Sequence, residues 1–398
     1  MKIKSISYIR EQDRPNAWVL KGDPNSNSPL YLNDINLIIG QNASGKSNTI
    51  EAIRNLADLL CGDQTLRNID RKTASYNVVF ENGQKHYNYI LSYVEGEVTD
   101  ERLFIDNVLR LDRSRGKMYY EKLKQDVDFK TDPSVLAATR RDSEQQSYLE
   151  DLYQWGRSTC AYYFGTHMGR NLLIRDIQSL LKETSFNPRE TDKVSGLFAW
   201  AMHTTPSIKP NVISDMERVG YHIEDISASL LKHFSVSAYG LSAKERGLNE
   251  ATEQLEMSQG MFRALSLLIQ LNYSLESNTP SCILIDDIGE GLDFERSKEL
   301  ITLIMEKTID SSIQVVMSSN DRYVMNIVPL EYWHVIWRSD NTSTLYNYRN
   351  SKKIFDDYRY LGLNNFEFFS TRFFKDGMSE LDDSLEEDDD DEEGEEAQ

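Results

Sequence analysis

The chain has 398 residues, and its hydrophobic content of 39% suits a globular protein with a sizeable core. The net charge of −20 is uneven: thirteen Asp and Glu fall in residues 378–398, and the remainder carries only −7, so a nucleic-acid partner is not excluded. The N-terminus lacks the apolar core of a signal peptide, and no apolar run approaches the roughly 20 residues that span a bilayer. The three cysteines form no C-x-x-C pair. These features argue against a disulfide scaffold, a zinc site and a membrane partner, and we expect a cytoplasmic location.

The first segment with a clear pattern is predicted to form a strand, a loop and a helix. Residues 1–39 have the pattern of short strands, and Ile35–Ile39 is an apolar run typical of a buried parallel strand. A glycine-bounded loop follows and leads into a helix that ends at Gly62. That helix has apolar residues at 3.6-residue spacing: Ile50, Ile53, Ala57 and Leu60.

An antiparallel β flap is predicted next. Asn82-Gly83 is a hairpin signal between Val78–Phe80 and Tyr87–Val94, and the second of these segments alternates apolar and polar residues. Residues 101–244 are rich in Gln, Glu, Arg and Leu, and we expect a mainly helical insertion there.

Regular α/β alternation resumes after the insertion. We expect helices over 259–274 and 294–307, strands over 282–285 and 313–317, and a last hairpin formed by 335–338 and 344–348. The predicted divisions are a first head part at 1–100, the insertion at 101–244, a second head part at 245–350, an aromatic segment at 351–377 and a disordered acidic tail at 378–398.

The glycine-bounded loop matches the phosphate-binding pattern G-x-x-x-x-G-K-[ST]. Its residues are Gly40, Gln41, Asn42, Ala43, Ser44, Gly45, Lys46 and Ser47, followed by Asn48. Glycines let successive amides point at phosphate oxygens, and the dipole of the following helix favours an anion. Lys46 is therefore expected to reach the β- and γ-phosphates of ATP, with Ser47 as a Mg²⁺ ligand.

Two further segments complete the predicted nucleotide site. Cys282–Asp287 is an apolar strand ending in two carboxylates, and Asp286 stands where a Walker B aspartate would hold Mg²⁺ opposite Ser47. Twenty-eight residues earlier, Ser258, Gln259 and Gly260 precede an apolar helix. On its own this triplet is an ordinary helix N-cap, but its hydroxyl, amide and helix terminus also suit a γ-phosphate bound on another subunit.

The order of these motifs resembles that of ABC-type ATPases of the SMC and RecF lineage, and most closely in style the stand-alone AAA-family ATPases of bacterial anti-phage defence. The likeness covers residues 1–100 and 245–340, and it implies an α/β ATPase head with a mixed or parallel central sheet. It also implies a homodimer or higher oligomer in which Ser258, Gln259 and Gly260 cap the nucleotide of the twin subunit. Asp293 would then belong to the D-loop that couples the two sites.

The chain departs from this family in its catalytic residues. The usual glutamate after the Walker B aspartate is replaced by Asp287, and Glu290 is a rival general base. Asn320 follows the strand at 313–317 where the family has a switch histidine, so hydrolysis is expected to be slow. The Q-loop glutamine cannot be assigned from the sequence.

Two functions remain open at this point. The first is an ATP-hydrolysing regulatory subunit that controls a separate effector, such as a nuclease or toxin, in anti-phage defence. Only 112 residues follow Asp286, and they show no nuclease-like acidic constellation. The second is a DNA-repair or DNA-clamping ATPase, for which the basic pieces at 67–72, 110–117 and 140–141 would contact phosphate backbones. His167 has no companion ligand and is expected to be a loop or core residue.

Overall fold

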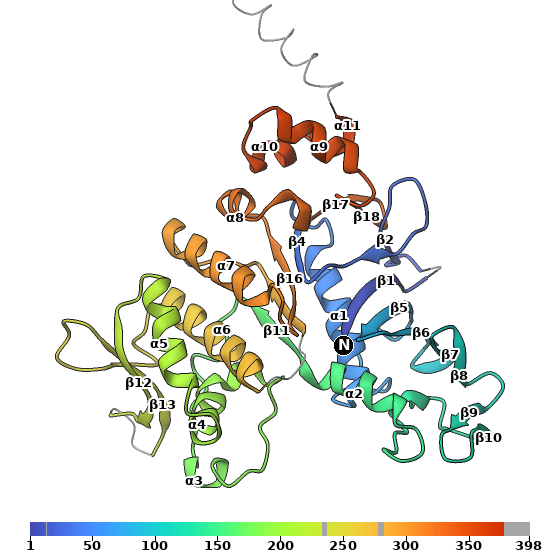
Figure 1. Ribbon diagram of the computed structural model, residues 1–398, viewed down its shortest axis with the longest axis horizontal. Coiled ribbons are helices and arrows are strands. Elements are labelled where there is room, and N and C mark those ends of the chain that lie inside the picture. The colour runs from blue at the N-terminus through green and yellow to red at the C-terminus, as the bar shows by residue number, and fades with distance from the viewer. Residues whose placement is uncertain (13, 233–236, 278–281, 378–398) are drawn as a thin grey trace, which may run out of the picture.

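The computed structural model describes residues 1–12, 14–232, 237–277 and 282–377. Its centre is one large mixed sheet with helices on both faces, joined to a smaller helical and antiparallel lobe and to a C-terminal group of helices (Figure 1). The predicted fold class, an α/β head with a mixed central sheet, is confirmed. The acidic tail predicted at 378–398 lies outside the described residues.

The parallel part of the sheet holds the five strands that matter most for the site. In spatial order these are β17 (Trp333–Ser339), β4 (Ile35–Ile39), β16 (Gln314–Ser319), β15 (Cys282–Asp286) and β11 (Thr159–Tyr163). Each runs parallel to its neighbour in this series. Their carboxyl ends therefore meet at one edge of the sheet, where ligands bind in open α/β sheets.

The remaining strands extend the same sheet beyond β17. Next come β18 (Thr342–Asn347), β2 (Trp18–Lys21) and β1 (Lys2–Arg10), with the short β3 (Leu30–Tyr31) beside β1. The flap completes the sheet with β5 (Ala74–Asn82), β6 (Lys85–Val94), β7 (Glu97–Ile105), β8 (Val108–Asp112), β9 (Lys117–Tyr120) and β10 (Gln125–Asp128). The predicted Asn82-Gly83 hairpin is confirmed, because β5 and β6 pair antiparallel around it.

The flap is longer than the sequence indicated. Residues 101–128, expected in the mainly helical insertion, form the rest of β7 and the strands β8, β9 and β10. These strands are short and, beyond β7, bury few of their side chains. They therefore lack the alternation of buried apolar residues that identifies a strand from sequence.

Helices cover the two faces of the parallel strands and create two separate cores. On one face α1 (Lys46–Cys61) and α2 (Tyr148–Ser158) pack against Ile38 and Leu284. On the other face α6 (Gln259–Glu276) and α7 (Phe294–Thr308) pack against Leu37 and Ile285. Neighbouring residues of one buried strand thus belong to different cores, as the alternation of side chains across a sheet requires.

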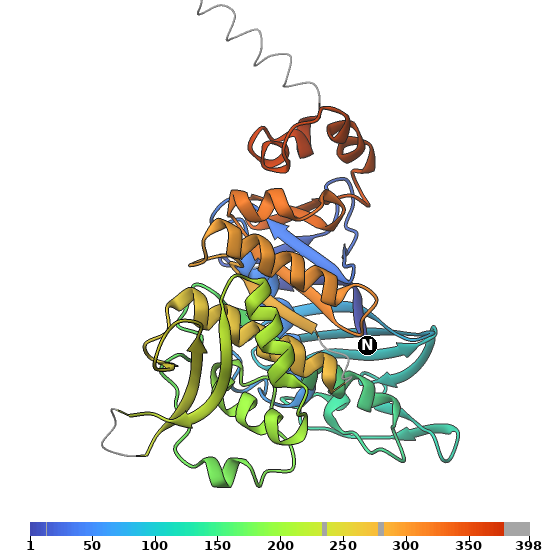
Figure 2. The same cartoon turned by 60° about the vertical axis from the view of Figure 1, so that its left-hand side comes forward.

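The smaller lobe is attached to α6. Its helices are α3 (Ile177–Leu180), α4 (Val194–Thr204) and α5 (Ile208–Arg218), and its antiparallel sheet contains β12 (Ile223–Leu230), β13 (Tyr239–Glu245) and β14 (Thr252–Glu253). Figure 2 shows α4 and α5 alongside α6. The core on this face is therefore continuous from the parallel strands into the lobe.

The C-terminal helices pack over the last hairpin and α8 (Arg322–Ile327), at the top of Figure 1. They are α9 (Lys352–Tyr360), α10 (Asn365–Ser370) and α11 (Phe373–Asp376). Phe355, Phe368, Phe373 and Phe374 are buried, so this aromatic segment belongs to the core. Among the described helices, none combines the length and apolar character needed to cross a bilayer.

Candidate functional site

The phosphate loop at 40–47 joins β4 to α1, and side chains on other strands of the sheet fix its conformation. Gly45 has φ 111°, and a Cβ added there would lie 2.7 Å from Ser343 Oγ, so no other residue fits without strain. Ser343 Oγ donates to Ser44 O at 2.7 Å and accepts from Trp18 Nε1 at 2.8 Å. The loop conformation is thus fixed by residues of β18 and β2, far away in sequence.

Lys46 opens α1 and points into the loop. Its Nζ donates to Gly40 O at 2.9 Å and to Gln41 O at 3.2 Å, and the residue is only 7% exposed. Burial lowers the pKa of this ammonium, while the nearby carboxylates of Asp287 and Asp286 oppose the shift. The lysine therefore shares one electrostatic environment with both carboxylates.

The two carboxylates are held at the end of β15 by Ser318 of the adjacent β16. Ser318 Oγ donates to Asp286 Oδ1, and the backbone N–H of Asp287 donates to Ser318 Oγ at 3.0 Å. Asp287 adopts φ 56°, which turns the chain sharply after the strand. Burial and the charge of Asp286 raise the pKa of Asp287, as expected for the second of two adjacent acids.

These groups surround a cavity of about 320 Å³. It is lined by Asn42, Ala43, Gly45, Lys46, Ser47, Asn48, Asp287, Asn320 and Arg338. Asn320 Nδ2 donates to Asn42 Oδ1 at 3.1 Å, which joins the end of β16 to the loop. The structure therefore brings together the phosphate loop, Asp287 and Asn320, whereas Glu290 is exposed and does not line this cavity.

The donor set suits a magnesium nucleotide. Ser47 lines the cavity, and Asp286 lies beside Asp287 with one oxygen already bonded to Ser318. Hydroxyl and carboxylate oxygens are the ligands that Mg²⁺ takes when substrate phosphates complete its coordination. No cluster of three His, Cys, Asp or Glu suited to a metal is found in the described part of the chain, so a metal held by protein side chains alone is not indicated there.

The segment at 258–260 lies outside this cavity. Ser258 caps α6, since its Oγ accepts from Met261 N at 3.2 Å, and both Ser258 and Gln259 are exposed. A Cβ on Gly260 would lie 2.6 Å from Gly291 O, so α6 and the loop at 288–293 are in close contact. Asp293 caps α7 through Arg296 N at 3.0 Å. The structure places these residues on a surface away from their own phosphate loop.

Arg263 holds that surface together. Its Nη1 donates to Glu290 O at 2.6 Å, and its Nη2 donates to Thr166 O at 3.2 Å. Thr166 belongs to the loop after β11, the strand that pairs with β15. This loop, residues 164–169, contains no glutamine, and His167 in it is exposed. The loop at 164–169 is placed here because β11 pairs with β15, about 120 positions further along the chain. A pairing over that distance leaves no local sequence signal.

Two arginines near the phosphate loop were missed from the sequence. Arg338 lies in the cavity, and Arg10 Nη1 reaches Asn48 Oδ1 at 3.4 Å while its guanidinium lies over Trp18. Both sit on strands outside the recognised motifs. Only their position at the end of a strand could have drawn attention to them.

The basic pieces considered for DNA contact are mostly engaged within the chain. Arg67 binds Asp132, Arg113 binds Glu101, and Arg141 binds Glu150. Lys117 pairs with Asp128, and the Arg110 guanidinium lies over the ring of Tyr119. These contacts give the basic residues structural roles in the flap.

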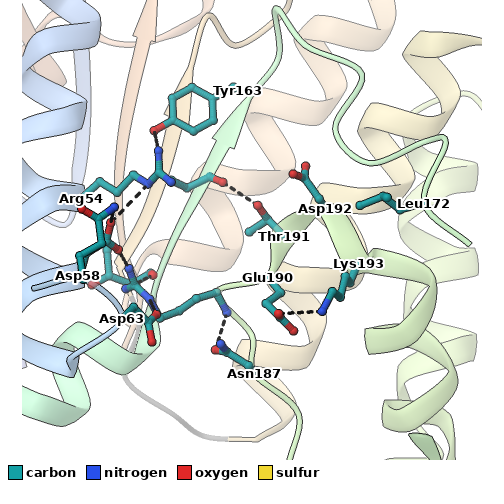
Figure 3. Close-up of a pocket in the computed structure, with 14 residues that line it drawn as sticks. Arg54, Asp58, Asp63, Tyr163, Leu172, Asn187, Glu190, Thr191, Asp192 and Lys193 are labelled. Carbon is teal, nitrogen blue, oxygen red and sulfur yellow. Dashed lines mark hydrogen bonds and ion pairs between the residues drawn. The ribbon is translucent and has the colours of Figure 1, made fainter. Parts of the chain in front are cut away.

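A second cavity, of about 410 Å³, lies between α1, β11 and residues 187–193 (Figure 3). Most of its charges are paired: Arg189 binds Asp58 and Asp63, and Lys193 binds Glu190 at 2.7 Å. Arg54 Nη1 donates to Tyr163 OH at 3.0 Å, and Tyr163 OH donates to Glu51. This larger cavity is a joint between the P-loop helix and the edge of the sheet.

Comparison with known proteins agrees with this geometry. A family described as "AAA domain, putative AbiEii toxin, Type IV TA system" matches residues 35–326. A search of curated proteins gives no match. An Smc head domain from Pyrococcus furiosus, bound to the C-terminal domain of ScpA, is similar in structure with a TM-score of 0.50 and 15% identity, covering 90% of this chain and 99% of that one.

Two further solved structures give lower scores. An SmcHead bound to the C-winged helix domain of ScpA has a TM-score of 0.49 at 16% identity, covering 87% of this chain and 97% of that one. The SMC head domain from Thermotoga maritima has a TM-score of 0.45 at 14% identity, covering 87% and 99%. Because the family model spans most of its length, the chain belongs to the family described as "AAA domain, putative AbiEii toxin, Type IV TA system", and its fold is similar to that of an Smc head domain.

Proposed function

We propose that this protein binds and hydrolyses MgATP in the cavity at the carboxyl edge of its parallel strands. The observation that carries the proposal is the meeting of Lys46 and Asp287 around one cavity, with Asp286 beside Asp287 at the end of β15, although the lysine and the two carboxylates come from segments 240 residues apart. A buried ammonium and a carboxylate that line one open cavity suit a substrate that brings both phosphates and a divalent cation.

Each residue has a role that follows from its position. Lys46 would exchange its two backbone carbonyl partners for phosphate oxygens, which are better acceptors because they are charged. Ser47 and Asp286 would hold Mg²⁺, which neutralises phosphate charge. Asn42 and Asn320 already share a hydrogen bond at the cavity wall and would orient the terminal phosphate.

Asp287 is the better candidate for the general base. It lines the cavity, and its raised pKa makes it a stronger proton acceptor than an ordinary aspartate. Glu290 is exposed, and its backbone carbonyl is bound by Arg263. The shorter side chain of Asp287 is consistent with the slow turnover expected from the sequence.

The second half of the active site would come from another copy of the chain. Ser258 and Gln259 are exposed at the N-terminus of α6, a helix of 18 residues, and they do not line their own cavity. The N-terminus of a helix, with an exposed serine hydroxyl beside it, suits a phosphate bound to the opposite subunit. We therefore expect dimerisation to depend on ATP.

At the level of biology, we propose that the ATP-bound dimer controls a separate effector, such as a nuclease or toxin, in defence against phage. The family description, which names a type IV toxin–antitoxin system, supports a role of this kind. A DNA-clamping role is the alternative, but the pairing of Arg67, Arg113 and Arg141 with acidic side chains of the same chain gives it less support.

The proposal is tested by measuring ATP binding, ATP turnover and sedimentation for the wild type, Lys46→Ala and Ser258→Arg. We expect Lys46→Ala to lose ATP binding, and Ser258→Arg to bind ATP but remain monomeric with little turnover. Unchanged ATP affinity in Lys46→Ala would show that the phosphate loop is not the site. Unchanged dimerisation in Ser258→Arg would refute only the two-subunit arrangement and would leave the phosphate-loop assignment intact.

Affinity purification with ATP separates the two biological roles. The effector hypothesis predicts that a second protein is retained by the wild type and lost from Lys46→Ala. The DNA hypothesis predicts retention of nucleic acid that falls steeply with salt.

A further inference from the structure

Arg338 occupies an unusual position relative to the phosphate loop. β17 runs parallel to β4, with Trp333 opposite Leu37 and Val335 opposite Ile39. Beyond Val335 the strand continues past the point where β4 turns into the loop, and Arg338 is three residues further along. The hairpin from β17 to β18 therefore carries a guanidinium over the loop from the side opposite Asp286 and Asp287.

The contacts of this guanidinium leave its charge unneutralised. Arg338 Nη1 donates to Ala43 O at 3.3 Å, and its Nε donates to Asp340 O at 2.7 Å. Both partners are neutral carbonyls, and Arg338 forms no ion pair with any carboxylate of the described residues. The first bond is long, so it can be exchanged for a charged acceptor at little cost.

The surroundings of Arg338 are crowded with positive charge. Burial and repulsion from Arg71 lower the pKa of Arg10, Tyr8 and Glu11 oppose the shift, and Arg338 adds a smaller repulsion. Lys46 lies in the same cavity as Arg338. A concentration of like charges around one loop is unfavourable in the free protein, and a polyanion bound there relieves it.

The opposite wall of the cavity lacks such a charge. Asn320 is neutral and its amide is already bonded to Asn42 Oδ1. We propose that Arg338 is a specificity-determining residue that binds the terminal phosphate and makes the site prefer a nucleoside triphosphate over a diphosphate. This inference rests on the proposed nucleotide-binding function, to which it adds a positive charge supplied by the same chain.

The C-terminal helices hold the hairpin in place for this role. Trp337, the neighbour of Arg338, packs against Phe374 with ring centroids 6.2 Å apart. Arg372 and Lys375 lie over the Trp337 ring at 5.2 and 5.7 Å. The strand is thus fixed on one face while Arg338 extends into the cavity from the other.

The test compares the affinities of a triphosphate and a diphosphate. Titration calorimetry with MgATPγS and with MgADP is done on the wild type, Arg338→Gln, Arg338→Lys and the control Arg349→Gln. Arg349 is a matched control because it lies just beyond the same hairpin and stacks on Tyr31.

We expect Arg338→Gln to weaken MgATPγS binding about tenfold and MgADP binding less than about threefold, as for the loss of one charge-assisted hydrogen bond. Arg338→Lys should recover part of the difference, and Arg349→Gln should match the wild type. Thermal unfolding of each variant confirms that the fold is kept.

Three results would overturn the inference: equal weakening of both nucleotides, no weakening of either, or a change confined to dimerisation. The last result would assign Arg338 to the subunit interface. The Lys46→Ala variant keeps this test distinct from that of the proposed function. If Lys46→Ala abolishes binding while Arg338→Gln has no effect, only the inference about Arg338 fails.

Discussion

The two cavities beside α1 differ in how their charges are satisfied. The larger one, of about 410 Å³, is lined by arginines and carboxylates that bind one another, among them Arg189, Asp58 and Asp63. In the smaller one, of about 320 Å³, Lys46 and Arg338 are bonded only to backbone carbonyls, and Asp287 keeps a raised pKa.

This difference indicates which cavity awaits a ligand. A buried charge whose partner is another side chain is already stabilised, and a ligand would have to break that pair. A buried charge with weak neutral partners is stabilised further when a ligand supplies the opposite charge. Charge satisfaction, rather than cavity size, therefore separates the proposed active site from the structural joint.

The largest expected effect is on catalysis. Asp287→Asn should lower ATP turnover by about 10² to 10⁴-fold, the usual range for a general base, with ATP affinity nearly unchanged. Steady-state phosphate release and nucleotide titration measure the two quantities. Glu290→Gln is the matched control and should retain most of the activity. If Glu290→Gln is the more damaging change, Asp287 is not the base.

The next effect is on stability at the joint. Arg189→Met removes the buried charged partner of Asp58, which keeps only Gln64 at 3.1 Å and Arg54 at 3.8 Å, so the free energy of unfolding should fall by about 3 kcal/mol. Chemical denaturation measures this change, and ATP affinity of the folded variant should match the wild type. A large loss of ATP affinity without loss of stability would show that this cavity belongs to the nucleotide site. The proposed difference between the two cavities would then be wrong.

The pH dependence of turnover sharpens the role of Asp287. A general base must be deprotonated, so turnover should fall about tenfold for each pH unit below its pKa, which burial and Asp286 raise above the ordinary value. The acidic limb of the profile should disappear in Asp287→Asn, with folding checked by circular dichroism. An identical limb in both proteins would assign it to another group.

The smallest expected effect is on the free energy of unfolding, and its sign is opposite to that of Arg189→Met. Lys46→Met removes an ammonium that burial disfavours and that binds only two carbonyls, so stability should stay the same or rise by about 1 kcal/mol. Denaturation in the absence of nucleotide measures it. A loss comparable to that of Arg189→Met would mean that Lys46 has a structural role.

The parallel part of the fold was predictable because its signals are local, with the exception of β11, which lies in the segment expected to be mainly helical. The run Ile35–Ile39, the glycines at 40 and 45, and the apolar spacing of α1 lie within 30 residues of one another. The strands β8 to β10 were not predictable, because few of their residues are buried and those few do not alternate with exposed ones along the chain.

The site shows the same division. Lys46, Asp287 and Asn320 were found from motifs, and the structure gathers them around one cavity. Arg338 reaches the cavity, and the loop at 164–169 reaches the surface around Arg263, through strand pairings that cross more than 100 residues. No short motif encodes such a pairing, so these residues could be assigned only from the structure. The roles proposed for Ser258, Gln259, Gly260 and Asp293 remain predictions, since they require a second copy.

The pairing of β4 has a consequence for how the molecule is made. This strand, near the start of the chain, pairs with β16 and β17, which begin at residues 314 and 333. During synthesis both of its edges therefore stay unpaired until almost the whole polypeptide has left the ribosome, and neither core can close before then. N-terminal fragments that stop before residue 314 should aggregate, and the nascent chain should depend on chaperones until its last hairpin emerges.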